Sequence, residues 1–178
     1  TLQQQRRPLQ ISAEERHATN LRVYTRLGFA LFACSVLLIG SLLLWASAKV
    51  QVPFYPVPMT MQTAVVFLLG IAYGPKLAVG TVLLYIAEGA MGLPVFAGTP
   101  ERGIGLPYIL GPTGGYIASW LLAAAITGYV AERRQHWLAI GSSVLVATLL
   151  IYLLGAAWLA GFVGVLGFAV LFDTPPAI

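Results

Sequence analysis

The chain has 178 residues, of which 58% are hydrophobic and only 9% are charged, and its formal net charge is +4. Soluble domains carry about 25% charged residues, so this composition excludes an ordinary soluble domain. The charges cluster between long uncharged runs, and a helix needs about 20 apolar residues to cross a bilayer. The sequence therefore predicts an all-α integral membrane protein.

The first 26 residues form a polar arm that contains five arginines. We expect this arm, residues 1–26, to be cytoplasmic and to contain a helix start at Ser12–Glu15. It serves either as a contact for the membrane surface or a partner, or as a solvated tail. Its arginines are not combined with the aromatic pattern of a nucleic-acid-binding segment, so no nucleic acid is expected as a partner.

Residues 27–178 are expected to form a single domain, a bundle of six transmembrane helices. Glycine and proline mark the breaks, and Gly74-Pro75-Lys76 is predicted to be a tight turn. The last apolar run, Trp137–Phe172, is longer than one crossing needs, so we place a break between Trp158 and Gly161. The expected helices are Leu27–Ala48, Gln62–Tyr73, Leu77–Met91, Tyr116–Ala131, Leu138–Trp158 and Gly161–Phe172.

The segment Val52–Met61 contains three prolines, Pro53, Pro56 and Pro58. Each proline removes a backbone donor, and together they exclude a regular helix. Irregular backbone at membrane depth is tolerated only where protein or water covers it. The segment is therefore either a wall or lid of a cavity, or an ordinary external loop.

The basic residues test the number of crossings. Six crossings place both ends of the chain on one side, where eight basic residues then fall, against Lys49 and Arg102 on the other side. Because basic residues favour cytoplasmic loops, both termini are predicted to be cytoplasmic. The eight residues are Arg6, Arg7, Arg16, Arg22, Arg26, Lys76, Arg133 and Arg134.

Two charged residues are the first candidates for chemistry. Glu88 lies inside an apolar helix, where a carboxylate is costly and is a functional-site hypothesis by default, although it could also reach the interface from the helix end. Arg102 offers a forked donor that suits a carboxylate or phosphate, or it is a solvated loop residue. Asp173 follows the last helix, and its plain interpretation is an interfacial aspartate.

The sequence lacks the usual signatures of an enzyme. His17 and His136 both lie in stretches that we expect to be cytoplasmic, and Cys34 is the only cysteine, so neither an intramembrane His site nor a disulfide is expected. No GxSxG, HExxH or ATP-binding P-loop is present. The chain is therefore predicted not to be an enzyme and to hold no metal.

Three motifs carry a resemblance to a known family. They are Pro-Val-Pro-Met-Thr-Met-Gln at Pro56–Gln62, Gly-Leu-Pro-Val-Phe-Ala-Gly at Gly92–Gly98 and Gly-Pro-Thr-Gly-Gly-Tyr at Gly111–Tyr116. In this order they resemble the BioY family, the biotin-specific substrate-binding (S) subunits of energy-coupling factor (ECF) transporters, over about Leu27–Trp158. The resemblance implies a six-helix ECF S-component fold in the bacterial inner membrane, with biotin as transported ligand and no cofactor.

The same resemblance implies partners and site residues. A transmembrane coupling subunit and two ABC-type ATPases would drive release of biotin. Arg102 would meet the carboxylate of biotin, and Glu88 would approach its ureido group. Asp173 retains the acid of a C-terminal Gly-Asp-x-x-Lys element, but Pro176 stands where that element has lysine. The other expected binding residues are Gln62, Tyr85, Phe96, Thr113, Tyr116 and Tyr152. The alternatives are an S-component for another vitamin and a membrane scaffold that transports nothing.

Overall fold

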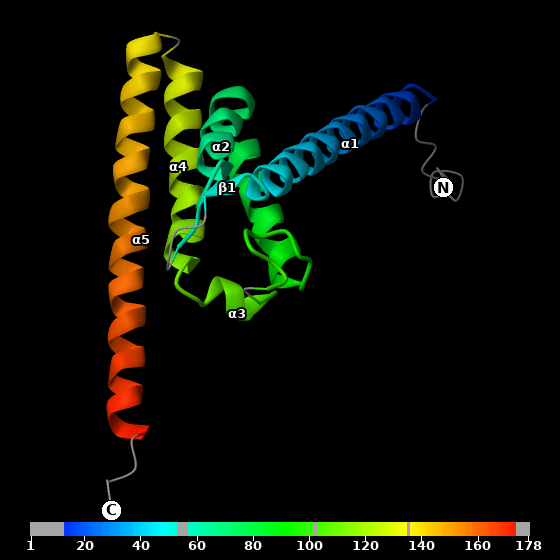
Figure 1. Cartoon of the computed structure of the whole chain (residues 1–178). Helices are drawn as coiled ribbons and strands as arrows, with labels where there is room; N and C mark the ends of the chain where they lie inside the picture. Colours follow the sequence, from blue (N-terminus) through cyan, green and yellow to red (C-terminus); the bar gives the residue numbers. More distant parts are fainter. Residues whose placement is uncertain (1–12, 53–56, 102, 135, 174–178) are drawn as a thin grey trace, which may run out of the picture. The chain divides into compact units, whose positions relative to one another are not determined.

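The computed structural model describes residues 13–52, 57–101, 103–134 and 136–173 (Figure 1). These residues divide between two compact units, one up to Ser35 and one from Val36 onward. The elements are the helices α1 (Ala13–Ala48), α2 (Gln62–Ala90), α3 (Leu106–Ile109), α4 (Gly114–Arg133) and α5 (Trp137–Asp173), and the short strands β1 (Gln51–Val52) and β2 (Met59–Thr60).

Four of the helices contain segments long and apolar enough to cross a membrane: Arg22–Ala48, Gln62–Ala90, Gly114–Arg133 and Trp137–Gly164. Large apolar side chains such as Leu145, Leu149 and Leu153 are exposed on α5, which in a soluble protein would be unfavourable but in lipid is the preferred arrangement. The chain is an all-helical, multi-pass membrane protein. Within the described residues the elements are five helices rather than the six expected.

Helix α2 is a hairpin of two helical arms. Gly74 has φ 73° and ψ 172°, which is not a helical conformation, and Pro75 follows it. The Nε2 of Gln62 donates to the hydroxyl of Tyr85 at 2.6 Å, whereas a straight helix would separate these residues by about 35 Å. The chain therefore reverses at Gly74-Pro75, and the predicted turn between two helices is confirmed.

Helix α5 contradicts the expected break between Trp158 and Gly161. The structure has one uninterrupted helix from Trp137 to Asp173. A glycine inside a helix costs only about 1 kcal/mol, whereas opening the backbone at membrane depth leaves polar groups unsatisfied at a cost of several kcal/mol each. Without a proline in this stretch, the glycines do not interrupt the helix, and the prediction of two helices is wrong. Helix α1 begins at Ala13, within the expected helix start Ser12–Glu15, and continues without a break through the expected first crossing Leu27–Ala48.

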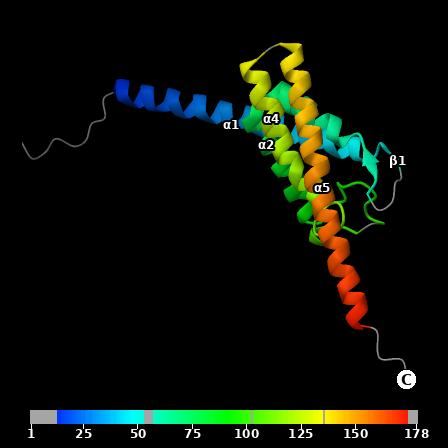
Figure 2. The ribbon, with the colours of Figure 1, turned by 90° about the vertical axis from the view of Figure 1, so that its left-hand side faces the viewer.

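The core of the second unit lies between the two arms of α2, α4 and α5. Figures 1 and 2 show α4 beside α5, and α2 packs on the other side of α4. Small residues allow this approach: a Cβ at Gly70 would overlap the side chain of Thr127, and one at Gly128 would overlap the backbone at Pro75. Small residues lie four apart on both helices, Gly70 and Gly74 on α2 and Ala124 and Gly128 on α4, and this spacing lets the helices pack closely.

The reversal of α2 should depend on the glycine at its turn. Replacing Gly74 by alanine forces a residue with a Cβ into a backbone conformation that only glycine adopts readily. This Cβ would also overlap the carboxylate of Glu132. We expect Gly74→Ala to destabilise the protein by about 1–3 kcal/mol, measured by thermal unfolding in detergent. Gly141→Ala is the matched control, because nothing lies within 4 Å of a Cβ there. Equal unfolding temperatures for the two variants would contradict the assigned turn.

Candidate binding site

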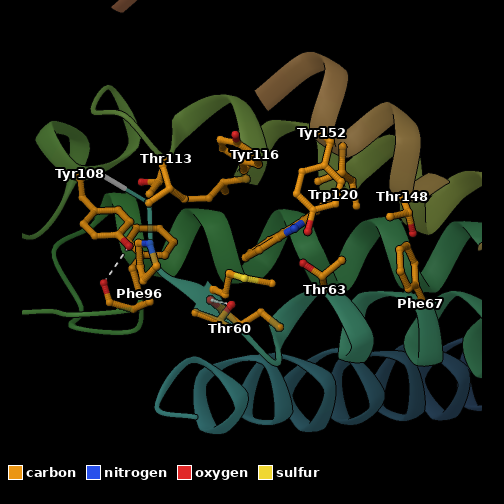
Figure 3. A pocket seen from close by; sticks show the side chains of 17 residues that line it. Thr60, Thr63, Phe67, Phe96, Tyr108, Thr113, Tyr116, Trp120, Thr148 and Tyr152 are labelled. Carbon is orange, nitrogen blue, oxygen red and sulfur yellow. Dashed lines mark hydrogen bonds between the residues drawn. The ribbon is translucent and has the colours of Figure 1, made fainter. Parts of the chain in front are cut away.

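A cavity of about 360 Å³ lies within the second unit, between α2, α4, α5 and the connecting segments (Figure 3). Its volume is within the range of small-molecule pockets, about 300–1,000 Å³. The described residues that line it are apolar, aromatic or uncharged polar, and none of them is charged. They are Val57, Pro58, Met59, Thr60, Gln62, Thr63, Phe67, Phe96, Ala97, Tyr108, Thr113, Tyr116, Ile117, Trp120, Thr148, Ile151 and Tyr152.

A buried hydrogen-bond chain holds one side of the cavity together. The hydroxyl of Tyr85 accepts from Gln62 and donates to the carbonyl oxygen of Val95 at 2.8 Å. The hydroxyl of Thr60 donates to Oε1 of Gln62 at 3.2 Å. Tyr85 and Gln62 are both buried, and buried polar groups need such partners. These hydrogen bonds thereby link both arms of α2 to β2 and to the loop that follows α2.

Aromatic rings close one end of the cavity. The ring of Phe96 lies parallel to that of Tyr108, with 4.8 Å between their centroids, and perpendicular to that of Tyr85, with 5.4 Å. Phe96 can approach α2 because it lies against Gly89, where a Cβ would overlap the ring. The hydroxyl of Tyr108 donates to the carbonyl oxygen of Ala97 at 2.8 Å. The motif Gly92–Gly98 therefore builds part of the aromatic wall.

The third motif, Gly111–Tyr116, lies at the start of α4 and packs against α5. Trp158 of α5 donates from Nε1 to the carbonyl oxygen of Gly111 at 2.9 Å, and its side chain covers Gly115. Tyr116 in turn lies against Gly155, and its ring is 6.5 Å from that of Tyr152. Both tyrosines line the cavity. The glycines of this motif thus let α5 approach closely enough to supply the opposite wall.

The structure places most of the predicted residues at or beside the cavity. Gln62, Phe96, Thr113, Tyr116 and Tyr152 line it. Tyr85 is not a lining residue, but its hydroxyl accepts a hydrogen bond from the lining residue Gln62. The proline-rich segment contributes residues 57–60 to the lining, as expected for a cavity wall.

Three predicted charged residues are not among the described lining residues. Glu88 lies outside the lining and accepts a hydrogen bond from the hydroxyl of Ser41 in α1. Arg102 lies outside the described residues, and Asp173 ends α5 in a stretch whose side chains are not described. The roles predicted for the three residues therefore stay predictions.

Other lining residues were not predicted. Trp120 and Ile117 are on α4 with Tyr116, and Thr148 and Ile151 are on α5 with Tyr152. Residues three and four apart share one face of a helix, so extending Tyr116 and Tyr152 by one turn would have found Trp120 and Thr148. Ile117 and Ile151 lie three residues from Trp120 and Thr148 and would have followed from them. Tyr108 lines the cavity from the short helix α3, and its aromatic ring with a polar tip is the sequence signal for a pocket residue there.

The comparisons with known proteins agree with this architecture. The model of the BioY family matches residues 20–175, nearly the whole chain. The chain belongs to the BioY family. Within that family, this BioY chain is 43% identical over 117 residues to the probable biotin transporter BioY of Pyrococcus horikoshii, covering 66% of the chain and 67% of the relative.

Two further BioY relatives extend the comparison. The biotin transporter BioY of Thermotoga maritima is 36% identical over 113 residues, which cover 64% of this chain and 65% of the relative. That of Rhizobium etli is 34% identical over 141 residues, which cover 79% of this chain and 68% of the relative. The BioY chain thus spans about two thirds of the length of these relatives.

A solved structure has the same fold as this BioY chain. It is the crystal structure of the S-component for biotin from an ECF-type ABC transporter, with a TM-score of 0.66 and 24% sequence identity. The superposition covers 75% of this chain and 74% of the solved one. The two proteins therefore share one fold over this part of their chains.

Proposed function

We propose that this BioY chain captures biotin as the substrate-binding subunit of an ECF-type transporter. Its relatives are named biotin transporters, and the solved protein with the same fold is named an S-component for biotin. The observation that carries the proposal is the aromatic, uncharged cavity between α2, α4 and α5. A membrane scaffold without a ligand would have no need of such a cavity.

The chemistry of the lining suits biotin. Biotin has a compact bicyclic ring with a thioether, an aliphatic chain and a cyclic urea that both donates and accepts hydrogen bonds. Phe96, Tyr108 and Trp120 offer apolar ring faces, and Thr63 and Thr113 add hydroxyl groups. Apolar walls with a few placed polar groups are typical of small-molecule sites. The ring system of biotin therefore matches the interior of the cavity.

The carboxylate of biotin needs a different environment from its ring. Burying a carboxylate among uncharged groups is costly unless a cation pairs with it, and the described lining supplies no cation. Arg102 follows the motif Gly92–Gly98, whose Phe96 and Ala97 line the cavity. We propose Arg102 as the partner of the carboxylate, by a charge-assisted and forked hydrogen bond.

Equilibrium binding of labelled biotin to the purified full chain in detergent tests the proposal. We expect saturable binding, and loss of binding in Thr63→Trp, because the new ring would occupy the cavity that Thr63 lines. In the same assay Arg102→Ala should weaken biotin binding by roughly 10–100-fold, the value of a charged hydrogen bond of about 1.5–3 kcal/mol.

Two control variants separate these effects from general damage. Leu145→Trp places the same ring on an exposed position of α5, and Arg134→Ala removes a charge at the end of α4; both should bind like the wild type. Absence of binding by folded wild-type protein would contradict biotin as the ligand, and a competition series with other vitamins would then identify the alternative. Full binding by Thr63→Trp would exclude the cavity as the site.

We further propose that the chain lies in the bacterial inner membrane with its N-terminus cytoplasmic and works with a coupling subunit and two ABC-type ATPases. The cytoplasmic placement of the C-terminal end depended on a sixth crossing, and the single helix α5 removes that crossing. The excess of basic residues on the N-terminal side supports the orientation, and the ECF context of the S-component that has the same fold supports the partners. Biotin uptake into reconstituted vesicles should rise on adding ATP and such a module. Uptake that is unaffected by the module would contradict this part of the proposal.

A further inference from the structure

Trp120 lines the cavity and carries a side-chain donor, Nε1, that has no hydrogen-bond partner among the residues described. It lies one turn after Tyr116 on α4, and both residues line the cavity (Figure 3). Only 5% of its side chain is exposed, and its ring packs against that of Tyr85, with 6.5 Å between centroids. Within the described residues, its Nε1 is the one buried side-chain nitrogen or oxygen that lacks a hydrogen-bond partner.

This unpaired donor is unlike the other buried polar groups around the cavity. Gln62 and the hydroxyls of Tyr85 and Tyr108 all have partners. Trp158, on α5, also pairs its indole N–H, with the carbonyl oxygen of Gly111. A buried donor that stays unpaired costs free energy, so the position of Trp120 in the cavity wall indicates that its partner comes from the ligand.

The surroundings of Trp120 specify the kind of acceptor. An indole N–H is a donor only, so its partner must carry an acceptor. The described lining is uncharged, which disfavours a carboxylate at this depth and favours a neutral carbonyl oxygen. Of the oxygens of biotin, only the ureido oxygen is a neutral carbonyl acceptor.

We infer that Nε1 of Trp120 donates a hydrogen bond to the ureido oxygen of biotin and so fixes the orientation of the bound ring. This inference rests on biotin being the ligand of the cavity. Trp120 is then a specificity-determining residue: it selects a carbonyl at the ring end of the ligand, while the carboxylate points away from it. A ligand that enters the cavity with its carboxylate first would leave this donor without its neutral partner.

Replacing Trp120 by phenylalanine tests the inference, because it removes the N–H and keeps an aromatic ring. The probes are biotin and biotin amide, which retains the ureido group and lacks the carboxylate charge; both are measured by competition with labelled biotin. We expect Trp120→Phe to weaken both probes by about tenfold, the loss expected when a buried acceptor is left unpaired. Trp45→Phe, which changes a partly exposed indole of α1 outside the lining, should leave both affinities unchanged.

Other outcomes would overturn the inference in recognisable ways. Unchanged binding of both probes would show that Nε1 does not contact the ligand. A loss for biotin that is absent for the amide would show that Nε1 contacts the carboxylate instead. If wild-type protein does not bind biotin at all, the proposed function fails first, independently of Trp120.

A second measurement needs no variant at position 120. In protein labelled with ¹⁵N-tryptophan, the indole N–H signal of Trp120 is assigned by elimination with Trp45→Phe, Trp137→Phe and Trp158→Phe. Saturation with biotin should move this signal downfield, as expected for a proton that gains a hydrogen bond. A signal that stays in place at saturation would contradict the inference.

Discussion

The cavity depends on the reversal of α2 and on the hydrogen bond that spans it. Gln62 and Tyr85 are 23 residues apart, yet they meet at 2.6 Å because the chain turns back at Gly74-Pro75. The hydroxyl of Tyr85 then donates a hydrogen bond to the carbonyl oxygen of Val95, and this contact positions the neighbouring Phe96 at the end of the cavity. One tight turn in the sequence therefore positions a polar side wall and an aromatic end wall together.

Glycine contributes to the site mainly by allowing rings to approach helices. Phe96 lies against Gly89, Tyr116 against Gly155 and the side chain of Trp158 against Gly115. In each pair the glycine removes the Cβ that would otherwise hold the ring away, and the ring then lines or borders the cavity. Phe96, Gly115 and Tyr116 belong to two of the motifs that identify the family, so packing around the cavity explains part of the composition of these two motifs.

Some of this architecture could be predicted from the sequence because the signals are local. Gly74 followed by Pro75 specifies a turn within two residues, and the proline-rich segment excludes a helix by itself. The continuity of α5 was not predictable in this way, since its glycines weaken a helix without breaking it. The helix continues because the membrane interior offers no other hydrogen-bond partners to the backbone groups that a break would free.

The site was predictable to the extent that motif residues line it. Phe96, Thr113 and Tyr116 belong to the motifs and face the cavity, whereas Trp120 lies outside them in an apolar helix. The local sequence of such a helix does not reveal whether an aromatic residue faces lipid, the protein core or a ligand. Only the packing of α4 between α2 and α5 reveals that Trp120 faces the cavity, and only its unpaired Nε1 indicates a ligand.

A structure of the protein determined with bound biotin tests the central claim, that this cavity is the ligand site. We expect the bicyclic ring between the Phe96–Tyr108 pair and the tyrosines of α4 and α5, with the ureido oxygen about 3 Å from Nε1 of Trp120. Biotin bound elsewhere in the protein, with the cavity between α2, α4 and α5 left empty, would contradict it.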